Sequence, residues 1–200
     1  MKQLSFLLLC LCLTGCLKSK VLLEDPAKCV LDKKLVGFWS MVDGKSKMIA
    51  AIGPSKVEGN PGSLVCYQGM SFSEEGQLDD DDQGTKKRSE YAFTVTIGNY
   101  GYLCLVTHDF SVPGEYAKWL ATKDQSCEIY RYRVDKDTFT LWAGDSAKLA
   151  EHGLKFEATP GVSGLKVFTG TQAELVEFLK TKSDKIFPDA DKMVFKRVAL

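Results

Sequence analysis

Apolar and polar residues alternate along two pairs of segments in the middle of the chain, as they do in strands that bury one face. In the first pair, residues 92–97 alternate strictly, residues 98–101 form a glycine-containing turn, and residues 102–107 continue the apolar pattern. In the second pair, residues 128–134 and 138–142 flank the turn sequence Asp-Lys-Asp. Each pair therefore predicts an antiparallel β-hairpin.

Shorter apolar runs between turn-forming residues predict further strands. They are residues 36–42, 47–52, 63–72 and 192–198. Residues 116–121 are compatible with either a strand or a short helix. Two polar stretches, residues 54–62 and 74–89, are expected to be loops because turn-forming and charged residues dominate them.

Two helices are predicted near the C-terminus. The first covers residues 146–152, with Asp145 as its N-cap and Gly153 as its stop signal. The second begins after Thr171, because Thr171 and Glu174 have the spacing of a capping box. An apolar stripe with i, i+3 and i+4 spacing follows, which is typical of an amphipathic helix that packs on a sheet. The stripe consists of Leu175, Phe178 and Leu179.

About eight short strands joined by hairpins, with one or two short helices near the C-terminus, predict a mainly β protein. Such strands form either an antiparallel barrel or a sandwich. A closed barrel leaves no exposed sheet edge, which favours the barrel. The length of the chain suits one domain with a substantial core.

Residues 1–15 have the features of a secretory signal peptide. Lys2 is their only charge, and an apolar run follows from residue 4 to residue 13. The run is shorter than the roughly 20 residues that span a bilayer. A buried core helix would also be apolar, but the leading charge and the small residue before Cys16 favour the signal peptide.

Residues 13–16, with the sequence Leu-Thr-Gly-Cys, resemble the lipobox of bacterial lipoproteins. The resemblance implies cleavage before Cys16, a diacylglyceryl group on its thiol and an acylated amino group. Two or three acyl chains meet the need of stable anchoring for more than one membrane signal. Leu17, in place of Asp after the cysteine, implies sorting to the outer membrane of the cell envelope. The expected organisation is a signal peptide, residues 1–15, a lipid anchor and tether, residues 16–33, and one domain, residues 34–200.

The sequence Gly37-Phe38-Trp39 opens the first predicted strand and resembles the first signature of the lipocalins and the wider calycin barrels. In that family the tryptophan closes one end of the barrel, the glycine lets the chain bend beside it, and a basic residue packs over the tryptophan. The resemblance assigns this barrel-closing motif to Gly37, Trp39 and Arg197. It implies an antiparallel, lipocalin-like barrel.

Three longer segments resemble uncharacterised bacterial lipoproteins with a lipocalin-like domain. They are residues 91–106, residues 130–142, and a tail that contains residues 186–187 and 194–197. This resemblance implies a fold, but it implies no particular activity.

Four of the seven cysteines lie beyond the lipid site: Cys29, Cys66, Cys104 and Cys127. An even number in an exported chain predicts two disulfides, which leaves three possible connectivities. A four-cysteine metal site is the rival interpretation, but the spacing is wide and no C-x-x-C pair is present. Because Cys29 and Cys127 both lie at the edges of predicted elements, we favour the pairs Cys29–Cys127 and Cys66–Cys104.

Charge and motifs point away from nucleic-acid binding and catalysis. Without Lys2 the 26 basic residues become 25 against 26 acidic ones, so no nucleic-acid partner is expected. His108 and His152 lack metal-ligand spacing, and no motif places a nucleophile near either. The acidic residues 79–82 lack the register of a calcium loop. We therefore expect no catalytic residue, metal or cofactor, and a protein that is not an enzyme.

Aromatic residues on the second hairpin are the remaining candidates for ligand contact. Tyr130, Tyr132 and Trp142 could line a cavity for a small apolar ligand or a lipid, or they could fill the interior of a small barrel. The leading hypothesis is a membrane-anchored, non-enzymatic binding module for such a ligand. The alternative is a protein-interaction module, for example an inhibitor of an envelope hydrolase.

Overall fold

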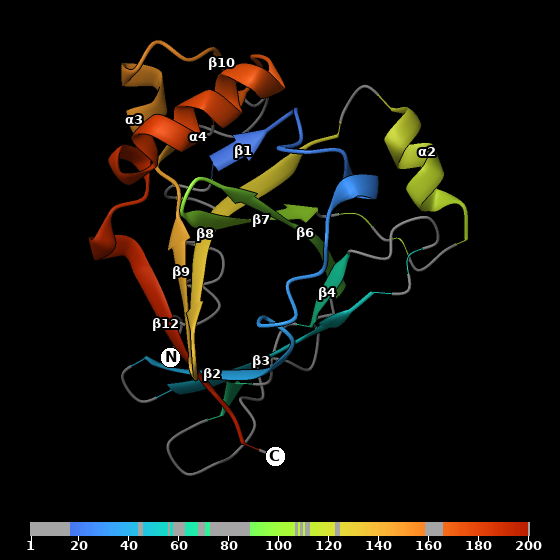
Figure 1. The fold of residues 1–200 in the computed structure, drawn as a ribbon, viewed down its shortest axis with the longest axis vertical. Helices are drawn as coiled ribbons and strands as arrows, with labels where there is room; N and C mark the ends of the chain where they lie inside the picture. The colour runs from blue at the N-terminus through green and yellow to red at the C-terminus, as the bar shows by residue number, and fades with distance from the viewer. Residues whose placement is uncertain are drawn as a thin grey trace.

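Twelve strands form a single sheet that curves around the interior of the protein (Figure 1). The structure is a computed structural model, and it describes residues 17–43, 46–55, 57, 63–67, 71–72, 89–106, 108, 110, 113–122, 125–158 and 166–199. The strands are β1 (Leu17–Ser19), β2 (Gly37–Asp43), β3 (Ser46–Pro54), β4 (Leu64–Tyr67), β5 (Ser71–Phe72), β6 (Ser89–Ile97), β7 (Tyr100–Val106), β8 (Cys127–Asp135), β9 (Thr138–Ala143), β10 (Phe156–Ala158), β11 (Lys166–Phe168) and β12 (Lys192–Arg197). The helices are η1 (Pro26–Lys28), α2 (Glu115–Ala121), α3 (Ser146–Glu151), α4 (Gln172–Ile186) and η3 (Asp189–Asp191).

Both predicted hairpins are confirmed. Strand β6 pairs with β7 over residues 91–97 and 100–106, and β8 pairs with β9 over residues 130–135 and 138–143. Gly98 takes a left-handed conformation (φ 61°) in the first turn, which costs a glycine little. These hairpins could be predicted because their alternation and their turns are local in the sequence.

The sheet divides at β8. One edge of β8 pairs with β7. The other edge pairs with β1 through residues 127–129 and with β9 through residues 130–135. Because β9 also pairs with β12, antiparallel pairing leads from β8 through β7, β6, β4, β3, β2, β12 and β9 back to β8.

The sheet as a whole is mixed and open. Strand β1 runs parallel to β11, β11 pairs with β10, and β10 has no further partner among the described strands. The prediction of a mainly β protein is confirmed. The prediction of a closed and wholly antiparallel barrel is wrong for the complete sheet. The physical reason is that β8 extends past the end of β9, and its free residues 127–129 recruit β1 and the strands beyond it.

The side of the sheet that faces into this circuit is filled with apolar and aromatic side chains. Leu103 and Tyr132 face this side from β7 and β8. The ring centroid of Phe139 lies 5.5 Å from that of Trp39, 5.3 Å from that of Phe195 and 6.3 Å from that of Tyr132. Within the described residues, side chains therefore occupy the interior.

The outer side of β6, β7 and β8 is buried as well. The ring of Phe93 on β6 stacks on Trp119 of α2, with centroids 6.2 Å apart. Tyr102 on β7 donates a hydrogen bond of 2.7 Å to the Ser183 hydroxyl of α4. Two separate apolar cores thus lie on the two sides of the same three strands.

The predicted helices are present. Helix α4 starts with the predicted capping box: the Glu174 amide donates to the Thr171 hydroxyl (3.2 Å), and the Thr171 amide donates to the Glu174 carboxylate (2.7 Å). The apolar stripe of α4 is buried. Residues 116–121, which fitted two element types, lie in α2. The single strand predicted for residues 63–72 is instead two strands, β4 and β5, which both pair with β3.

The N-terminal segment is part of the fold, so the prediction of a tether over residues 16–33 is wrong for the described residues 17–33. Leu17 is fully buried, and β1 lies between β11 and β8. The Lys20 amide donates to the Phe168 carbonyl (3.0 Å). Three residues of mixed polarity carry no strand pattern, and their partners lie far along the chain, so the sequence offered no signal for β1.

Candidate functional site

The residues of the predicted barrel-closing motif lie together at one end of the strand circuit. The Arg197 guanidinium lies 4.2 Å from the centroid of the buried Trp39 ring. Gly37 has a positive φ of 144°, and a Cβ atom there would lie 2.6 Å from Nη1 of Arg197. Glycine therefore meets both requirements of this position, the backbone conformation and the close approach of the arginine.

The same arginine holds the chain that enters β2. Arg197 donates to the carbonyls of Val36 (2.9 Å) and Lys34 (2.7 Å). Trp39 donates through Nε1 to the Leu35 carbonyl (2.8 Å), and Leu35 is fully buried. Residues 34–36 are thereby fixed across the end of the circuit.

The aromatic residues proposed for ligand contact do not line one cavity. Tyr130 and Tyr132 belong to the interior core, whereas Trp142 belongs to the outer core. The register explains the separation, because Trp142 pairs with Arg131 and so shares the outer side of β8. The prediction that Tyr130, Tyr132 and Trp142 form one ligand site is therefore wrong.

A surface groove lies where the N-terminal segment passes the end of β6. Strand β4 pairs with β6 only as far as Ala92. Two hollows, of about 410 Å³ and about 210 Å³, lie next to the remainder of β6. Asp32, Thr96 and Tyr132 line both hollows, which we call together the terminal groove. Its residues are Glu24, Lys28, Cys29, Val30, Leu31, Asp32, Lys34, Thr94, Val95, Thr96, Gly98, Asn99, Tyr100, Gly101, Tyr132, Arg133 and Val134.

Hydrogen bonds make the floor of the terminal groove rigid. The Tyr132 hydroxyl donates to the Asp32 carboxylate (2.8 Å), and the Thr94 hydroxyl donates to the Val30 carbonyl (2.9 Å). Burial, followed by the bond to Asp32, raises the pKa of Tyr132 above its ordinary value, so this hydroxyl is a neutral donor. Gly101 leaves room for the Tyr132 ring, since a Cβ there would lie 2.5 Å from it.

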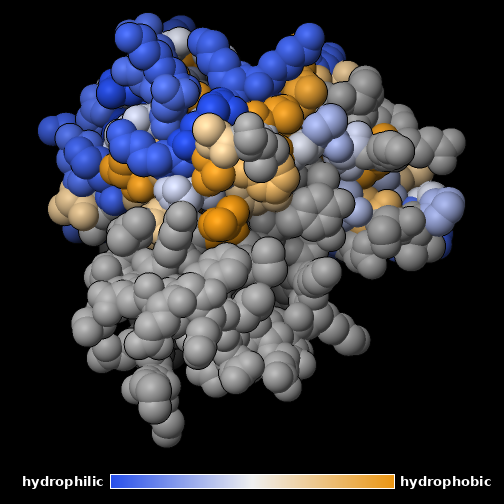
Figure 2. All heavy atoms as spheres, turned by 90° about the horizontal axis from the view of Figure 1, so that it is seen from below, coloured by the Kyte–Doolittle hydropathy of each residue, from blue (hydrophilic) through white to orange (hydrophobic). Residues whose placement is uncertain are grey.

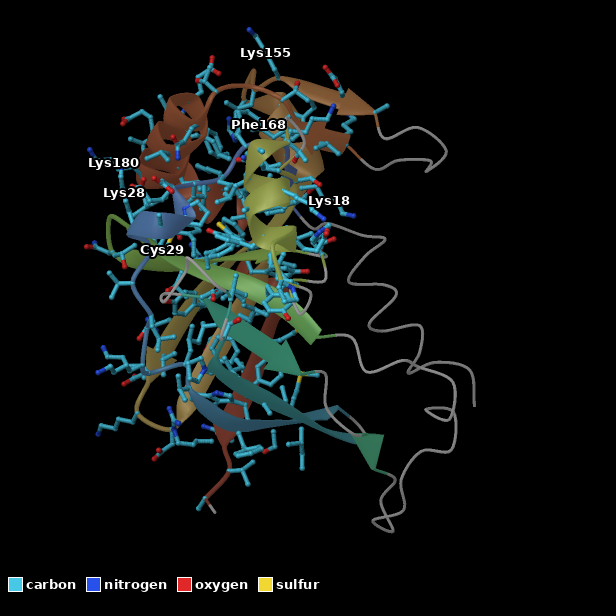
Figure 3. The ribbon with its side chains drawn as sticks, turned by 90° about the vertical axis from the view of Figure 1, so that its right-hand side faces the viewer. Lys18, Lys28, Cys29, Lys155, Phe168 and Lys180 are labelled. Carbon is cyan, nitrogen blue, oxygen red and sulfur yellow. The ribbon has the colours of Figure 1, made fainter. Side chains whose placement is uncertain are left out.

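The walls of the terminal groove combine charge with an exposed apolar side chain. Lys28, Lys34 and Arg133 contribute positive charge, and Glu24 and Asp32 contribute negative charge. Val30 is 79% exposed, more than any other large apolar residue in the described part of the chain. Figure 3 shows Lys28 and Cys29 on the N-terminal segment beside the edge of the sheet. Such walls suit a ligand that has both polar and apolar parts.

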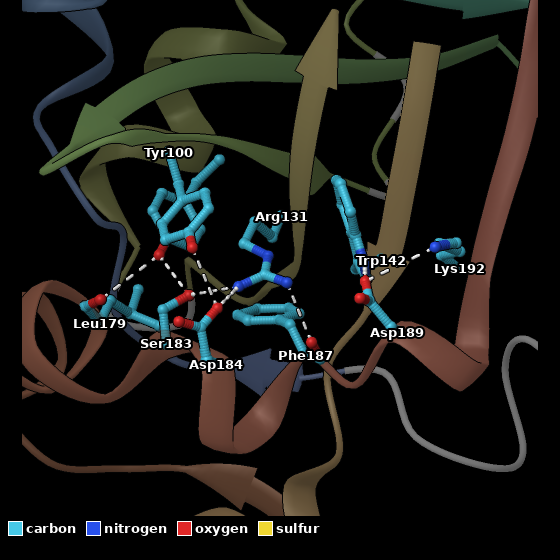
Figure 4. Close-up of polar contacts among 10 residues, drawn as sticks. Tyr100, Arg131, Trp142, Leu179, Ser183, Asp184, Phe187, Asp189 and Lys192 are labelled. Atoms are coloured by element: carbon cyan, nitrogen blue, oxygen red, sulfur yellow. Dashed lines mark hydrogen bonds and ion pairs between the residues drawn. The ribbon is translucent and has the colours of Figure 1, made fainter. Parts of the chain in front are cut away.

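A buried arginine forms a second polar cluster on the outer side of β8 (Figure 4). The Arg131 side chain is 5% exposed and lies over the rings of Tyr100 (4.5 Å) and Trp142 (4.7 Å). Its guanidinium binds the Asp184 carboxylate and donates to the Phe187 carbonyl (3.0 Å). Nε of Arg131 is buried without a hydrogen-bond partner in the described structure.

The contacts of Arg131 attach the end of α4 to the sheet. Lys182 has non-helical backbone angles, and the next two residues, Ser183 and Asp184, both contact the arginine. The Tyr100 hydroxyl also donates to Asp184 (3.1 Å), and this bond is the main cause that raises the pKa of Tyr100. This cluster could not be predicted from the sequence. Arg131 lies between two tyrosines in a strand where charged and apolar residues are mixed, so no local pattern marks it as buried.

The predicted disulfides are not present. Cys29, Cys104 and Cys127 are free, buried thiols in the described structure, so neither Cys29–Cys127 nor Cys66–Cys104 is formed. The register gives a reason for the second pair. Position 66 pairs with Glu90, whereas position 104 pairs with Phe93. Positions 90 and 93 lie on opposite sides of β6, because successive residues of a strand alternate.

The two histidines have structural contacts. His108 lies 3.6 Å from the Glu115 carboxylate, and its neighbours 107 and 109 lie outside the described residues. The His152 ring packs against Phe178 at a centroid distance of 5.6 Å. Over the described ranges, no group of three or more His, Cys, Asp or Glu side chains is arranged to hold a metal ion. The acidic residues 79–82 lie outside those ranges.

Comparison with protein-family models, curated proteins and solved structures found no match for this chain. No helix in the described part of the chain is long and apolar enough to cross a membrane. The features that bear on the function are therefore the terminal groove, the contact of Trp39 with Arg197 and the N-terminal cysteine motif.

Replacing Arg197 by lysine should lower the free energy of unfolding by about 1–3 kcal/mol, because lysine keeps the charge but loses the planar fork that binds two carbonyls and stacks on Trp39. Urea unfolding measures the effect. The matched control is Arg133→Lys, an exposed position where a change of less than about 0.5 kcal/mol is expected. Equal losses of unfolding free energy in the two variants would contradict a stabilising contact of Arg197 with Trp39 and the two carbonyls.

Replacing Asp184 by asparagine should lower the free energy of unfolding by about 0.5–1 kcal/mol, because Arg131 loses its ionic partner, while water screens a carboxylate that is 74% exposed. Glu177→Gln is the control, since Glu177 is exposed on the same helix. Urea unfolding of both variants checks the prediction. A loss in Asp184→Asn no larger than in Glu177→Gln would show that Arg131 does not depend on this carboxylate.

Proposed function

We propose that this protein is a non-enzymatic binding module with a lipocalin-like architecture, anchored to the bacterial cell envelope by lipid on Cys16. The proposal combines three features: the antiparallel strand circuit, the N-terminal cysteine motif and the terminal groove. The partners it requires are a membrane and one small ligand, with no cofactor and no nucleic acid.

The strand circuit supports the architecture. Eight strands are linked by antiparallel pairing back to the starting strand, as a lipocalin-like barrel requires. Trp39, Gly37 and Arg197 meet at one end of this circuit, which is the contact that the lipocalin resemblance implies. The branch formed by β1, β11 and β10 would then be an addition to the barrel.

The position of β1 supports a short connection between lipid and protein. Cys16 directly precedes β1, whose first residue, Leu17, is fully buried. A lipid on Cys16 would therefore hold the start of β1 close to the membrane surface. Lys18 and Lys20, in and just after this strand, are partly exposed, and each forms an ion pair with a glutamate.

The observation that carries the binding function is the contrast between the filled interior and the terminal groove. Aromatic rings occupy the described interior, whereas the larger hollow of the groove measures about 410 Å³ and reaches the surface beside Val30. A ligand of this module would bind in the groove. The mixed walls favour a small amphiphile, with its apolar part on Val30 and its polar part near Lys28 and Asp32.

A protein-interaction module is the second candidate, and one observation favours it. Strand β10 presents an edge with no partner among the described strands, and such edges can accept an added strand from another protein. Figure 2 shows hydrophobic residues between hydrophilic ones and the residues drawn in grey. An inhibitor of an envelope hydrolase would fit this candidate.

Lipid attachment is tested by growing a bacterial host that produces the full chain with a clickable palmitate analogue. We expect labelled protein in the membrane fraction and loss of the label in Cys16→Ser. Cys12→Ser is the matched control, because this cysteine lies in the apolar run before the cleavage site, and its label should remain. Undiminished labelling of Cys16→Ser would overturn the anchoring proposal.

Ligand binding is tested by native mass spectrometry of the full chain released from detergent. We expect a bound small molecule, and we expect Val30→Glu to reduce its occupancy at least about tenfold, because a charge would replace the apolar contact. Val194→Glu is the control, since Val194 is 40% exposed but does not line the groove. Absence of any bound molecule, or equal losses in both variants, would contradict the groove as a ligand site.

A further inference from the structure

Three buried thiols from three separate elements lie in the outer core. Cys29 follows η1, Cys104 lies on β7 and Cys127 begins β8. Their exposed fractions are 8%, 2% and 3%, and all three belong to the same apolar core. Cys104 is among the neighbours that raise the pKa of both Cys29 and Cys127, as expected for thiols that share one core.

Cys104 and Cys127 lie on the same side of two neighbouring strands. Cys104 pairs with Ile129 across β7 and β8, so Cys127 is its diagonal neighbour on that side of the sheet. Diagonal neighbours lie farther apart than residues directly opposite each other. Cys104 is also the first cause of the raised pKa of Cys127, which agrees with this placement.

We propose that Cys104 and Cys127 form the disulfide of the oxidised protein, and that Cys29 remains a thiol in the wall of the terminal groove. The two sulfur atoms lose two electrons and two protons and become bonded. A small disulfide such as oxidised glutathione accepts them, its S–S bond breaks, and it leaves as two thiols. One bridge forms, in place of the two that the even number of cysteines predicts.

The neighbouring cysteines do not offer an equivalent bridge. Cys29 donates through Sγ to the Asp25 carbonyl (3.6 Å), on its own segment, and it lines the larger hollow of the groove. Position 66 belongs to the opposite side of the sheet from position 104. The register places Cys104 and Cys127 on the same side of two paired strands, which favours a bridge between them.

Burial determines when this bridge can form. Thiolates, not thiols, attack disulfides. Burial is the largest cause that raises the pKa of Cys29, to about 12, and the interaction of the Cys127 thiol with Cys104, followed by burial, raises the pKa of Cys127 well above its ordinary value. Oxidation should therefore be slow in the folded, reduced protein and fast while the chain folds in the presence of an oxidant.

Peptide mapping tests the pairing directly. The full chain is reduced, unfolded in urea, refolded with oxidised glutathione, blocked with iodoacetamide and digested with trypsin. Cleavage after lysine and arginine places the four cysteines in separate peptides: residues 29–33, 57–86, 89–118 and 124–131. We expect peptides 89–118 and 124–131 to be joined, with the mass of two hydrogen atoms lost. Peptides 29–33 and 57–86 should carry the blocking group.

The Cys29→Ser variant is the matched control, and it should give the same joined peptides in the same yield. A main product that joins peptide 29–33 or 57–86 to any other would overturn the proposal, as would blocking of all four cysteines. Because the oxidant is added, this result does not depend on the proposed envelope location. Mapping the protein from cells without added oxidant tests that location separately, since reduced Cys104 there would contradict an oxidising compartment.

Discussion

Strands β6, β7 and β8 are buried on both sides over much of their length, and the polar side chains buried there need partners inside the protein. Thr94 and Tyr132, on the inner side, bind the N-terminal segment at Val30 and Asp32. Arg131, on the outer side, binds the end of α4. The polar groups of the central strands thus determine where two distant segments of the chain are held. A buried polar group without a partner would raise the free energy of the folded state, and these contacts avoid that.

The need of these buried polar groups for partners also determines where the terminal groove lies and where the strand circuit is covered by Trp39 and Arg197. The N-terminal segment leaves the outer core at Cys29, follows the free end of β6 and reaches the interior at Leu35. Trp39 and Arg197 then hold residues 34–36 across the end of the strand circuit. The groove is the space beside this crossing, so its floor is formed by residues that the fold itself requires.

Much of the fold could be predicted because its signals are local. The two hairpins, the capping box of α4 and the short helix α3 each depend on residues within one turn or one alternating run. The site could be predicted only in part. The contact of Trp39 with Arg197 was expected from a resemblance, whereas the groove and the Arg131 cluster depend on contacts between residues far apart in sequence. The predicted pair Cys66–Cys104 does not agree with the strand register, because cysteine counting ignores which side of a strand each residue occupies.

The sequence by itself determined the element types, the strand alternation and the N-terminal motif, because periodicity, turn residues and capping residues act over a few neighbours. Only the tertiary structure decided which of the two alternating faces lies inside the circuit, and that both faces are buried. It also decided that β1 joins the sheet at the end of β8. These outcomes depend on which edges and faces of the strands remain uncovered after the hairpins have formed. Patterns within a few neighbouring residues do not predict which ones those are.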